Sequence, residues 1–316
     1  MANEIQPIKS YAHFYNESTW ATKPGSPSYV FCPVLNYGVQ LRRESRNAAT
    51  FTGLRQRKHG QHFRDTLSGG VTVPLYGWRP SGLAMSLAEY FLVWAFGSGG
   101  STDAVMLASK GVEWAEGPDV ANQRHHGLRI NSATLSGSAD SGFVQLALDL
   151  IGKNDEAVTT AQTIPNDMEK CVEFEWADCA FEIGGSAVEL RSFQLQIQNG
   201  LRGEFVGGRS ISLLPASQRV VSLQMELVKS ANTWDVYRRT AADTETNAEL
   251  TLKGLHNGTG TAETSYAVST ITLPRIRYGM HEDQRGRDGL SFLPLQFDVL
   301  KPDSSSNDVA IVMSEE

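Results

Sequence analysis

The chain has 316 residues, with 28 lysines and arginines against 35 aspartates and glutamates, so its formal net charge is −7. This length suits one large domain or two ordinary ones, and the acidic balance argues against a dedicated nucleic-acid-binding protein. The three cysteines (Cys32, Cys171 and Cys179) show no C-x-x-C spacing, and no histidine lies at a zinc-finger offset. We therefore expect neither a disulfide framework nor a structural zinc site.

The N-terminal sequence MANEIQPIK lacks the apolar stretch of a signal peptide. The longest apolar run, Tyr90–Phe96, is far shorter than the ~20 residues that span a bilayer. The expectation is a protein that is made in the cytoplasm and has no membrane partner.

Strict alternation of apolar and polar residues is the main structural signal along the chain. In SFQLQIQN, residues 192–199, the apolar Phe193, Leu195 and Ile197 are separated by glutamines. This pattern is typical of antiparallel strands with one face in a core and one face in water. The same alternation is found in FVQLALDL (143–150), CVEFEW (171–176), VSLQMELV (221–228) and LPLQFDVL (293–300).

Two segments have helical spacing. The first, residues 81–96, has Ser81 as a candidate N-cap and Gly97 as a stop. The second, residues 231–241, is shorter and more polar. The apolar stripe of the first helix consists of Leu83, Leu87, Phe91 and Trp94.

The order of these elements is repeated. Each half reads strand, long loop rich in glycine and arginine, strand, helix, and then further strands. We therefore predict a first β domain over residues 1–155 and a second over residues 170–302, joined by a polar segment. Residues 303–316 are predicted to form a flexible tail, because they are short, polar and rich in serine.

The run CVEFEWADCAFEIGG (171–185), followed by VELRSFQLQIQNGLRGEFVGGR (188–209), a strand and a short helix, resembles siphophage tail tube proteins, also called major tail proteins. FTGLRQRKHGQ (51–61) before GGVTVPLYG (69–77) resembles them too, and the likeness extends from about Tyr29 to Leu300. It implies a mainly β fold, a tail-tube-like sandwich or barrel with flanking short helices. It also implies a protein that is not an enzyme and has no cofactor.

The same resemblance implies a structural virion protein that self-assembles into stacked rings. These rings would form the tail tube of a phage with a long non-contractile tail, a conduit for DNA delivery into the host. Some members carry two tube domains, which implies trimeric, pseudo-hexameric rings here, with hexameric rings as the alternative. The implied partners are the tape measure, tail terminator and tail tip proteins, and phage DNA that passes without sequence-specific binding. The implied location is the virion tail, assembled in the cytoplasm of the bacterial host.

Charge is segregated along the chain. Residues 41–65 contain seven basic and two acidic residues, whereas residues 153–183 contain eight acidic and two basic ones. Opposite patches on one chain favour head-to-tail contacts, which build filaments when the rotation does not close. The candidates for ring stacking are Arg55, Arg57, Lys58, His59, Arg64, Arg202 and Arg209, and those for an acidic complementary or lumenal face are Glu169, Glu173, Glu175, Asp178 and Glu182.

Other interpretations remain open from the residues alone. The basic loop around Arg55 could bind nucleic acid or be a solvated surface loop. Glu173 and Glu175 could form a glycosidase pair, which makes a soluble β-sandwich carbohydrate-binding or carbohydrate-hydrolysing protein the alternative function. The histidines of RHH (124–126) and HED (281–283) lack the spacing of metal ligands, so we expect them in loops and predict no metal site.

Overall fold

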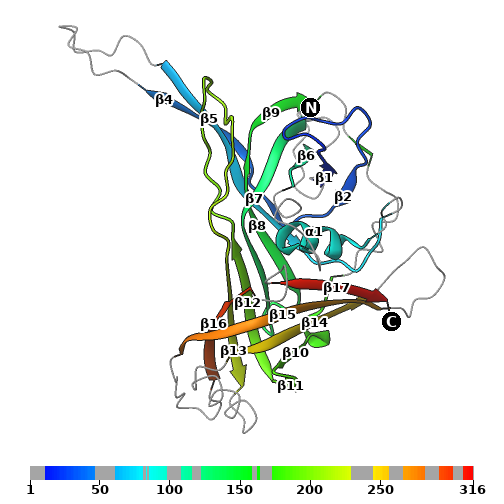
Figure 1. The fold of residues 1–316 in the computed structure, drawn as a ribbon. Helices are drawn as coiled ribbons and strands as arrows, with labels where there is room; N and C mark the ends of the chain where they lie inside the picture. Colours follow the sequence, from blue (N-terminus) through cyan, green and yellow to red (C-terminus); the bar gives the residue numbers. More distant parts are fainter. Residues whose placement is uncertain are drawn as a thin grey trace.

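The computed structural model describes residues 11–46, 61–80, 83, 85–97, 108–115, 122–158, 162–163, 173–228, 245–255, 266–281, 292–301 and 309–315. The protein is mainly β, as the sequence predicts, and its strands pair in antiparallel fashion (Figure 1). The predicted helix at 231–241 and the basic loop at 47–60 lie outside the described residues.

The first half of the chain builds its strands around β7. β7 pairs with β6, β8 and β9, β6 also pairs with β1, and β8 also pairs with β5. β1 further pairs with β2, and β5 with β3 and β4. The elements are β1 (Tyr11–Asn16), β2 (Val30–Cys32), β3 (Asn36–Tyr37), β4 (Gln40–Arg46), β5 (Gln61–Pro74), α1 (Leu87–Phe96), β6 (Lys110–Ala115), β7 (Asn122–Ser138), β8 (Val144–Gly152) and β9 (Asn154–Val158).

The second half repeats this pairing pattern around β15. β15 pairs with β14, β16 and β17, β14 also pairs with β10, and β16 also pairs with β13. β10 further pairs with β11, and β13 with β12. The elements are the 3₁₀ helix η3 (Trp176–Asp178), β10 (Ala180–Ile183), β11 (Ser186–Ala187), β12 (Leu190–Gln198), β13 (Val220–Val228), β14 (Thr246–Leu255), β15 (Tyr266–His281), β16 (Phe292–Val299) and β17 (Ala310–Glu315).

The repeat extends to the irregularities of the strands. The pairing of β7 with β8 shifts register between Ile130 and Ser132, and that of β15 with β16 shifts between Tyr278 and Met280. The pairing of β6 with β7 shifts just after Lys110, and that of β14 with β15 shifts just after Thr246, at the corresponding position. A β-bulge bends a strand at a defined place. Because the bulges lie at corresponding positions in the two halves, the halves share one architecture.

The halves are joined by a direct strand pairing. Ser132–Ser138 of β7 pair with Gln198–Ser192 of β12 over seven register pairs. β4, β5, β8, β7, β12, β13, β16 and β15 therefore form one continuous sheet, most of which runs vertically in Figure 1.

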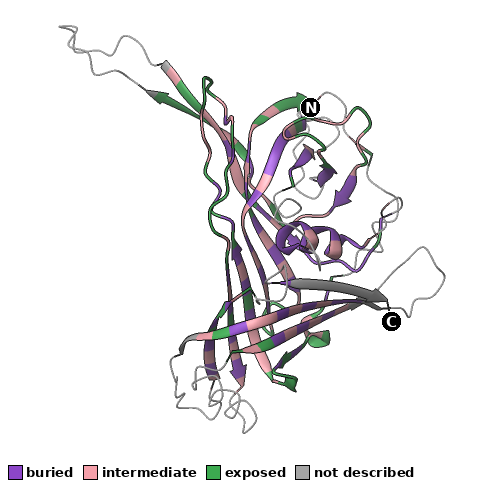
Figure 2. Cartoon of the chain, in the orientation of Figure 1, coloured by how far each residue is buried: buried purple, intermediate pink, exposed green. Residues whose placement is uncertain are grey.

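Alternation along these strands separates a core from a wet face (Figure 2). Phe193, Leu195 and Ile197 of β12 are buried, whereas Gln194 and Gln198 between and beside them are exposed. The buried faces of both halves belong to one large apolar cluster. Burial of this surface is the main favourable contribution to folding.

The one α helix of the described residues starts later than predicted. Its N-cap is Ser86, whose Oγ accepts a hydrogen bond from the Glu89 N–H at 3.2 Å, and not Ser81. Ser86 and Glu89 have the spacing of a capping box, which sequence analysis overlooked. The helix ends as predicted at Gly97, where φ is 86°. It is buried almost all round, and it lies next to β17.

Two other predictions differ from the structure. Residues 171–176 were expected to form a strand, but the described part has isolated bridges at Glu173 and Glu175, and η3 follows directly. The flexible tail predicted for 303–316 is also wrong in part, because Ala310–Glu315 form β17. β17 pairs with the first part of β15, as β9 pairs with the first part of β7 in the first half, so this strand completes the repeat.

Close backbone approach explains the one gap in the repeat. β12 is continuous, whereas its counterpart is divided into β3 and β4 at Gly38. A Cβ at Gly69 of β5 would lie 2.1 Å from the carbonyl oxygen of Gly38. The corresponding position of β13 is Leu223. Its side chain leaves no room for such a close approach, so β12 and β13 keep the regular spacing between strands.

Candidate assembly surfaces

Two arms extend together from one end of the molecule (Figure 1). One is the outer part of the β4–β5 hairpin, and the other is the connection between β12 and β13, residues 199–219. The Asp65 N–H donates a hydrogen bond to the Arg209 carbonyl oxygen at 2.9 Å, and Asp65 forms a parallel bridge with Ser210. An arm from the second half therefore lies on the edge of β5 in the first half.

Cationic and aromatic side chains also connect the arms. The Arg64 guanidinium lies 4.7 Å from the ring centroid of Phe63 and 4.7 Å from that of Phe205. Within β5, His62 Nε2 is 2.5 Å from Asp65 Oδ1, and across the arms Arg209 Nη1 lies 3.4 Å from His62 Nδ1. Cation–π contacts of this kind contribute about 0.5–1 kcal/mol at exposed sites, so several of them are needed to hold the arms together.

The base of the second arm is fixed by β7. Asn199 donates its side-chain N–H to the Ile130 carbonyl at 2.9 Å, and Asn131 Oδ1 accepts the Leu201 N–H at 2.9 Å. A small apolar cluster supports this base. It comprises Leu201, Ile211 and Leu214, with Trp20, Ile151 and Phe205 packed against them.

The structure places three of the seven predicted stacking residues on these arms. Arg64 lies on β5, and Arg202 and Arg209 lie on the second arm, all exposed. Arg202 Nε is 3.2 Å from Glu204 Oε1. Arg55, Arg57, Lys58 and His59 lie outside the described residues.

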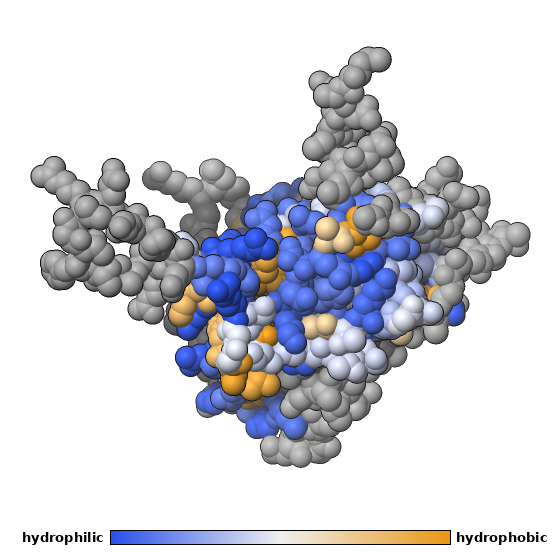
Figure 3. All heavy atoms as spheres, turned by 90° about the horizontal axis from the view of Figure 1, so that it is seen from above, coloured by the Kyte–Doolittle hydropathy of each residue, from blue (hydrophilic) through white to orange (hydrophobic). Residues whose placement is uncertain are grey.

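Exposed apolar side chains on the arms were missed by sequence analysis. Phe63 is 40% exposed, Val206 66% and Leu213 59%. Figure 3, which looks down on this end, shows apolar patches within a hydrophilic surface. Single apolar residues in polar loops gave no periodic signal in the sequence.

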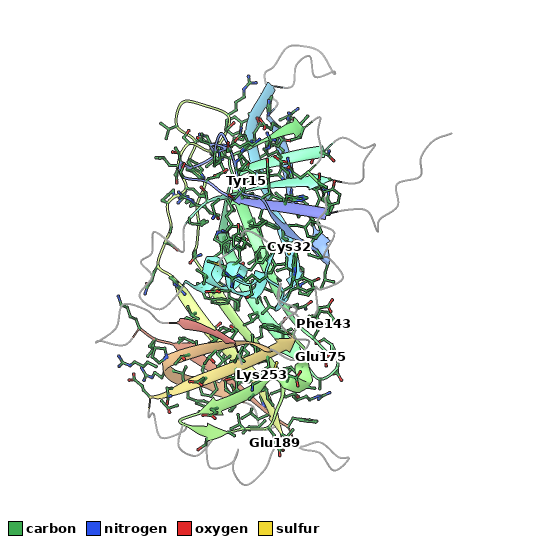
Figure 4. All side chains as sticks on the ribbon, turned by 90° about the vertical axis from the view of Figure 1, so that its right-hand side faces the viewer. Tyr15, Cys32, Phe143, Glu175, Glu189 and Lys253 are labelled. Atoms are coloured by element: carbon green, nitrogen blue, oxygen red, sulfur yellow. The ribbon has the colours of Figure 1, made fainter. Side chains whose placement is uncertain are left out.

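The acidic candidates lie away from the arms. β10, which carries Glu182, is at the opposite end of the molecule in Figure 1, and Figure 4 shows Glu175 in the same half. Glu173, Glu175, Asp178 and Glu182 are all exposed. The basic and acidic candidates are thus not brought together within one chain. Glu169 lies outside the described residues.

Glu173 and Glu175 are held by the buried residue between them. The Phe174 N–H donates to the Leu75 carbonyl at 2.8 Å, and the Phe174 carbonyl accepts the Val144 N–H at 3.0 Å. Phe174 is fully buried, so the two carboxylates point to solvent from the edge of the first half.

A row of uncharged polar side chains crosses the junction of the two halves. Its members are successive register partners on five neighbouring strands, and they line a groove on the wet face of the sheet. The row contains amide and hydroxyl groups and no charge. It runs Gln145, Ser136, Gln194, Gln224, Gln296.

The RHH segment was expected in a loop, but it lies in β7 and is part of a buried polar network. Arg124 Nη2 is 2.6 Å from Glu113 Oε1, and Arg124 also pairs with Glu156 of β9. Burial, together with the neighbouring His126, lowers the pKa of His125 to about 4. Within the described residues, no group of three or more histidine, cysteine or acidic side chains could hold a metal ion.

The described residues thus form a mainly β protein with a polar sheet face, two arms at one end and acidic side chains away from the arms. The particular family follows from the sequence: the family model described as phage tail tube protein matches residues 9–298, and the chain belongs to that family. It is therefore a structural protein of the virion tail. No curated protein matches the chain. Of the helices described, none has the length and apolarity needed to cross a membrane.

Proposed function

We propose that three chains form a ring in which six tube domains alternate, and that stacked rings form the tube of a long non-contractile phage tail. The observation that carries this proposal is the repeated strand pairing within one continuous sheet. Family membership supports the tube, and the repeat supports two ring positions per chain. The two domains would be residues 1–155 and 170–302, with β17 added to the second.

Stacking would use the two ends of the molecule. The arms carry Arg64, Arg209 and exposed apolar residues, and the opposite end carries Glu175 and Glu182. A head-to-tail contact between these ends is heterologous and open, so it grows into a filament. Each exposed ion pair contributes only about 0–1 kcal/mol. Many pairs around a ring must therefore act together, with apolar contacts between them.

The conduit for DNA would be lined by the wet face of the continuous sheet. Glutamine and serine side chains such as Gln194 and Ser136 offer no fixed positive charge to phosphates, so DNA would pass without being held. Of the two roles open to the acidic candidates, this leaves them the complementary face and not the lumen. The tape measure would occupy the lumen before DNA, and the terminator and tip proteins would close the two ends. Assembly would occur in the host cytoplasm.

The test of the ring is direct. Native mass spectrometry of the purified chain, with rotational averaging of negative-stain images, should give three chains per ring and six repeated densities around a central hole. Six chains per ring would support the hexameric alternative and overturn the trimer. A chain that stays monomeric at every concentration and in every salt would overturn the ring altogether.

Stacking has its own test. Arg209→Glu should leave rings intact but shorten or abolish tubes, because it places a negative charge against the acidic end of the next ring. Lys301→Glu makes the same charge change at an exposed residue away from the arms and serves as the control. Equal tube lengths for the two variants would contradict the role of Arg209.

A further inference from the structure

We propose that the turn at residues 17–22, between β1 and β2, is a latch that holds the second arm (residues 199–219) in place, with Trp20 as the contact. The arm is then ordered before a neighbouring ring arrives, which lowers the cost of ordering it on stacking. The latch depends on contacts within one chain, and its use in stacking rests on the function proposed above.

The turn is fixed to β7 through Glu17, whose side chain is 0% exposed. Glu17 Oε2 accepts the Ala21 N–H within the turn at 2.9 Å, and Oε1 accepts the Gly127 N–H of β7 at 3.0 Å. The Trp20 indole N–H donates to the Gly127 carbonyl at 2.9 Å. The turn therefore binds both backbone polar groups of one residue of β7.

Gly127 can receive the turn because β7 is irregular there. The register of β7 with β6 shifts between His125 and Leu128. Gly127 has no register partner in the described pairings of β7, so its N–H and C=O need partners from elsewhere. Its φ is 70°, and a Cβ there would lie 2.8 Å from Trp20 Nε1. A larger residue would therefore push the indole away.

The latch also holds a strained residue. Ala21 has a φ of 56°, which is the one positive value among the described residues other than glycine. A side chain is disfavoured in this left-handed region, so the conformation persists because its surroundings fix it. Since Glu17 holds the Ala21 N–H, loss of that carboxylate should let the turn relax and move Trp20.

Trp20 connects the turn to the arm. With Ile151 and Phe205, it packs against the apolar cluster of Leu201, Ile211 and Leu214. The Arg129 guanidinium of β7 lies 5.4 Å from the centroid of the Trp20 ring, and its Nη1 lies 3.5 Å from the Leu214 carbonyl oxygen. Without the indole, the cluster would lose one wall and Arg129 would lose a ring that helps to place it.

The latch acts on the middle of the arm. The base is held separately by Asn199 on the Ile130 carbonyl, and the outer part by the Arg209 carbonyl on Asp65. Neither contact involves the turn, so both should persist when the latch is removed. Release should therefore open residues 201–214 locally and leave β12 and β13 paired.

Hydrogen exchange of the unassembled chain, followed by mass spectrometry, tests the latch. Three amides of the arm are hydrogen-bonded within it and report its order: Arg202 to the Pro215 carbonyl, Glu204 to the Leu213 carbonyl and Ser212 to the Glu204 carbonyl. Their exchange requires the arm to open.

Three variants weaken the latch to different degrees. Trp20→Ala removes the ring, Trp20→Phe keeps a ring without the indole N–H, and Glu17→Gln sets an amide N–H against one of the two bound N–H groups. Ser18→Ala, at an exposed residue of the same turn, is the matched control.

Trp20→Ala should speed exchange across residues 201–214 at least tenfold, and Trp20→Phe and Glu17→Gln should speed it by a smaller factor. Ser18→Ala should stay within twofold of the parent, as should β12 and β13 in every variant. Unchanged arm exchange would overturn the latch. So would equal acceleration in the arm, β12 and β13, because the turn would then support the whole fold. If Trp20→Ala does not fold, the two milder variants decide.

A double variant tests the path from Trp20 to the arm. If the contact with the apolar cluster transmits the effect, Trp20→Ala should speed arm exchange by a smaller factor in a Leu214→Ala background than in the parent. Equal factors would mean that the two residues act independently, which would overturn Trp20 as the contact.

Assembly gives a separate measurement. The critical concentration for tube formation should rise at least threefold in Trp20→Phe and stay unchanged in Ser18→Ala. A freed arm with an unchanged critical concentration would overturn the role of the latch in stacking. If the parent chain forms no tubes, the proposed function fails, whereas the exchange measurement still decides the latch.

Discussion

Leu195 of β12 lies directly opposite Leu135 of β7, and both side chains are buried where the two halves of the chain meet. This pair makes the junction part of the core and not a surface contact between independent units. We therefore expect the junction to stay intact during unfolding until the core itself opens.

The first prediction concerns this junction. Leu195→Ala should lower the free energy of unfolding by about 2–5 kcal/mol, because it leaves a cavity in the core. Urea unfolding followed by fluorescence measures the change. Gln194→Ala, on the exposed side of the same strand, should stay within about 0.5 kcal/mol of the parent. Similar losses for the two variants would show that Leu195 is not a core residue.

The second prediction concerns α1. Trp94 is 2% exposed, its Nε1 donates a hydrogen bond to the Ala108 carbonyl at 3.0 Å, and its ring is 6.3 Å from that of Phe14. Trp94→Ala should cost ~3–5 kcal/mol. The subunit should then misfold before it assembles. Val93→Ala, at a half-buried position of the same helix, is the control. A Trp94→Ala variant that melts like the parent would contradict the prediction.

A comparison of β12 with β7 shows which strands could be predicted from the sequence. The alternation around Phe193 predicted β12, and the same signal predicted β8, β13 and β16. β7 was harder, because His125 and His126 are buried in it and a bulge follows Ile130. Buried polar residues that form a network interrupt the alternation of apolar and polar residues, so the sequence predicted a loop at RHH.

The candidate surfaces were predictable only in part. The repeat in element order and the charge difference between segments were visible in the sequence. The pairing of Ser132–Ser138 with Ser192–Gln198 was not, because it depends on two distant segments whose patterns would fit many partners. The row through Gln194 and Gln224 follows from that register, and so it became visible only in the fold.

The third prediction tests the helix start. Ser86→Ala should cost about 0.5–2 kcal/mol, since the Glu89 N–H loses its acceptor. Ser86→Asp keeps an acceptor there and should retain most of the stability. Thermal melting of the two variants beside the parent measures the difference. If both lose the same amount, the hydroxyl of Ser86 is not the cap.

The last prediction concerns Lys110, which is buried with its Nζ 2.6 Å from Asn16 Oδ1 and 3.7 Å from the ring centroid of Tyr90. Burial lowers the pKa of Lys110 to about 7. In the unfolded chain a lysine keeps its usual pKa of about 10.4. Between these values the unfolded state binds more protons than the folded state, so stability rises with pH, by up to roughly 1.4 kcal/mol per pH unit.

This slope should be measured between pH 7 and 9. Burial raises the pKa of the Cys179 thiol to about 12. At pH values above the usual pKa of a thiol, the folded state therefore binds more protons at Cys179 than the unfolded state does, and this group makes stability fall as pH rises. Urea unfolding at intervals across this window should show stability rising in the parent and a markedly flatter profile in Lys110→Met. Lys301→Met, at an exposed lysine, should keep the slope of the parent. Parallel profiles for the parent and Lys110→Met would mean that Lys110 stays protonated in the fold, held by Asn16 and the Tyr90 ring.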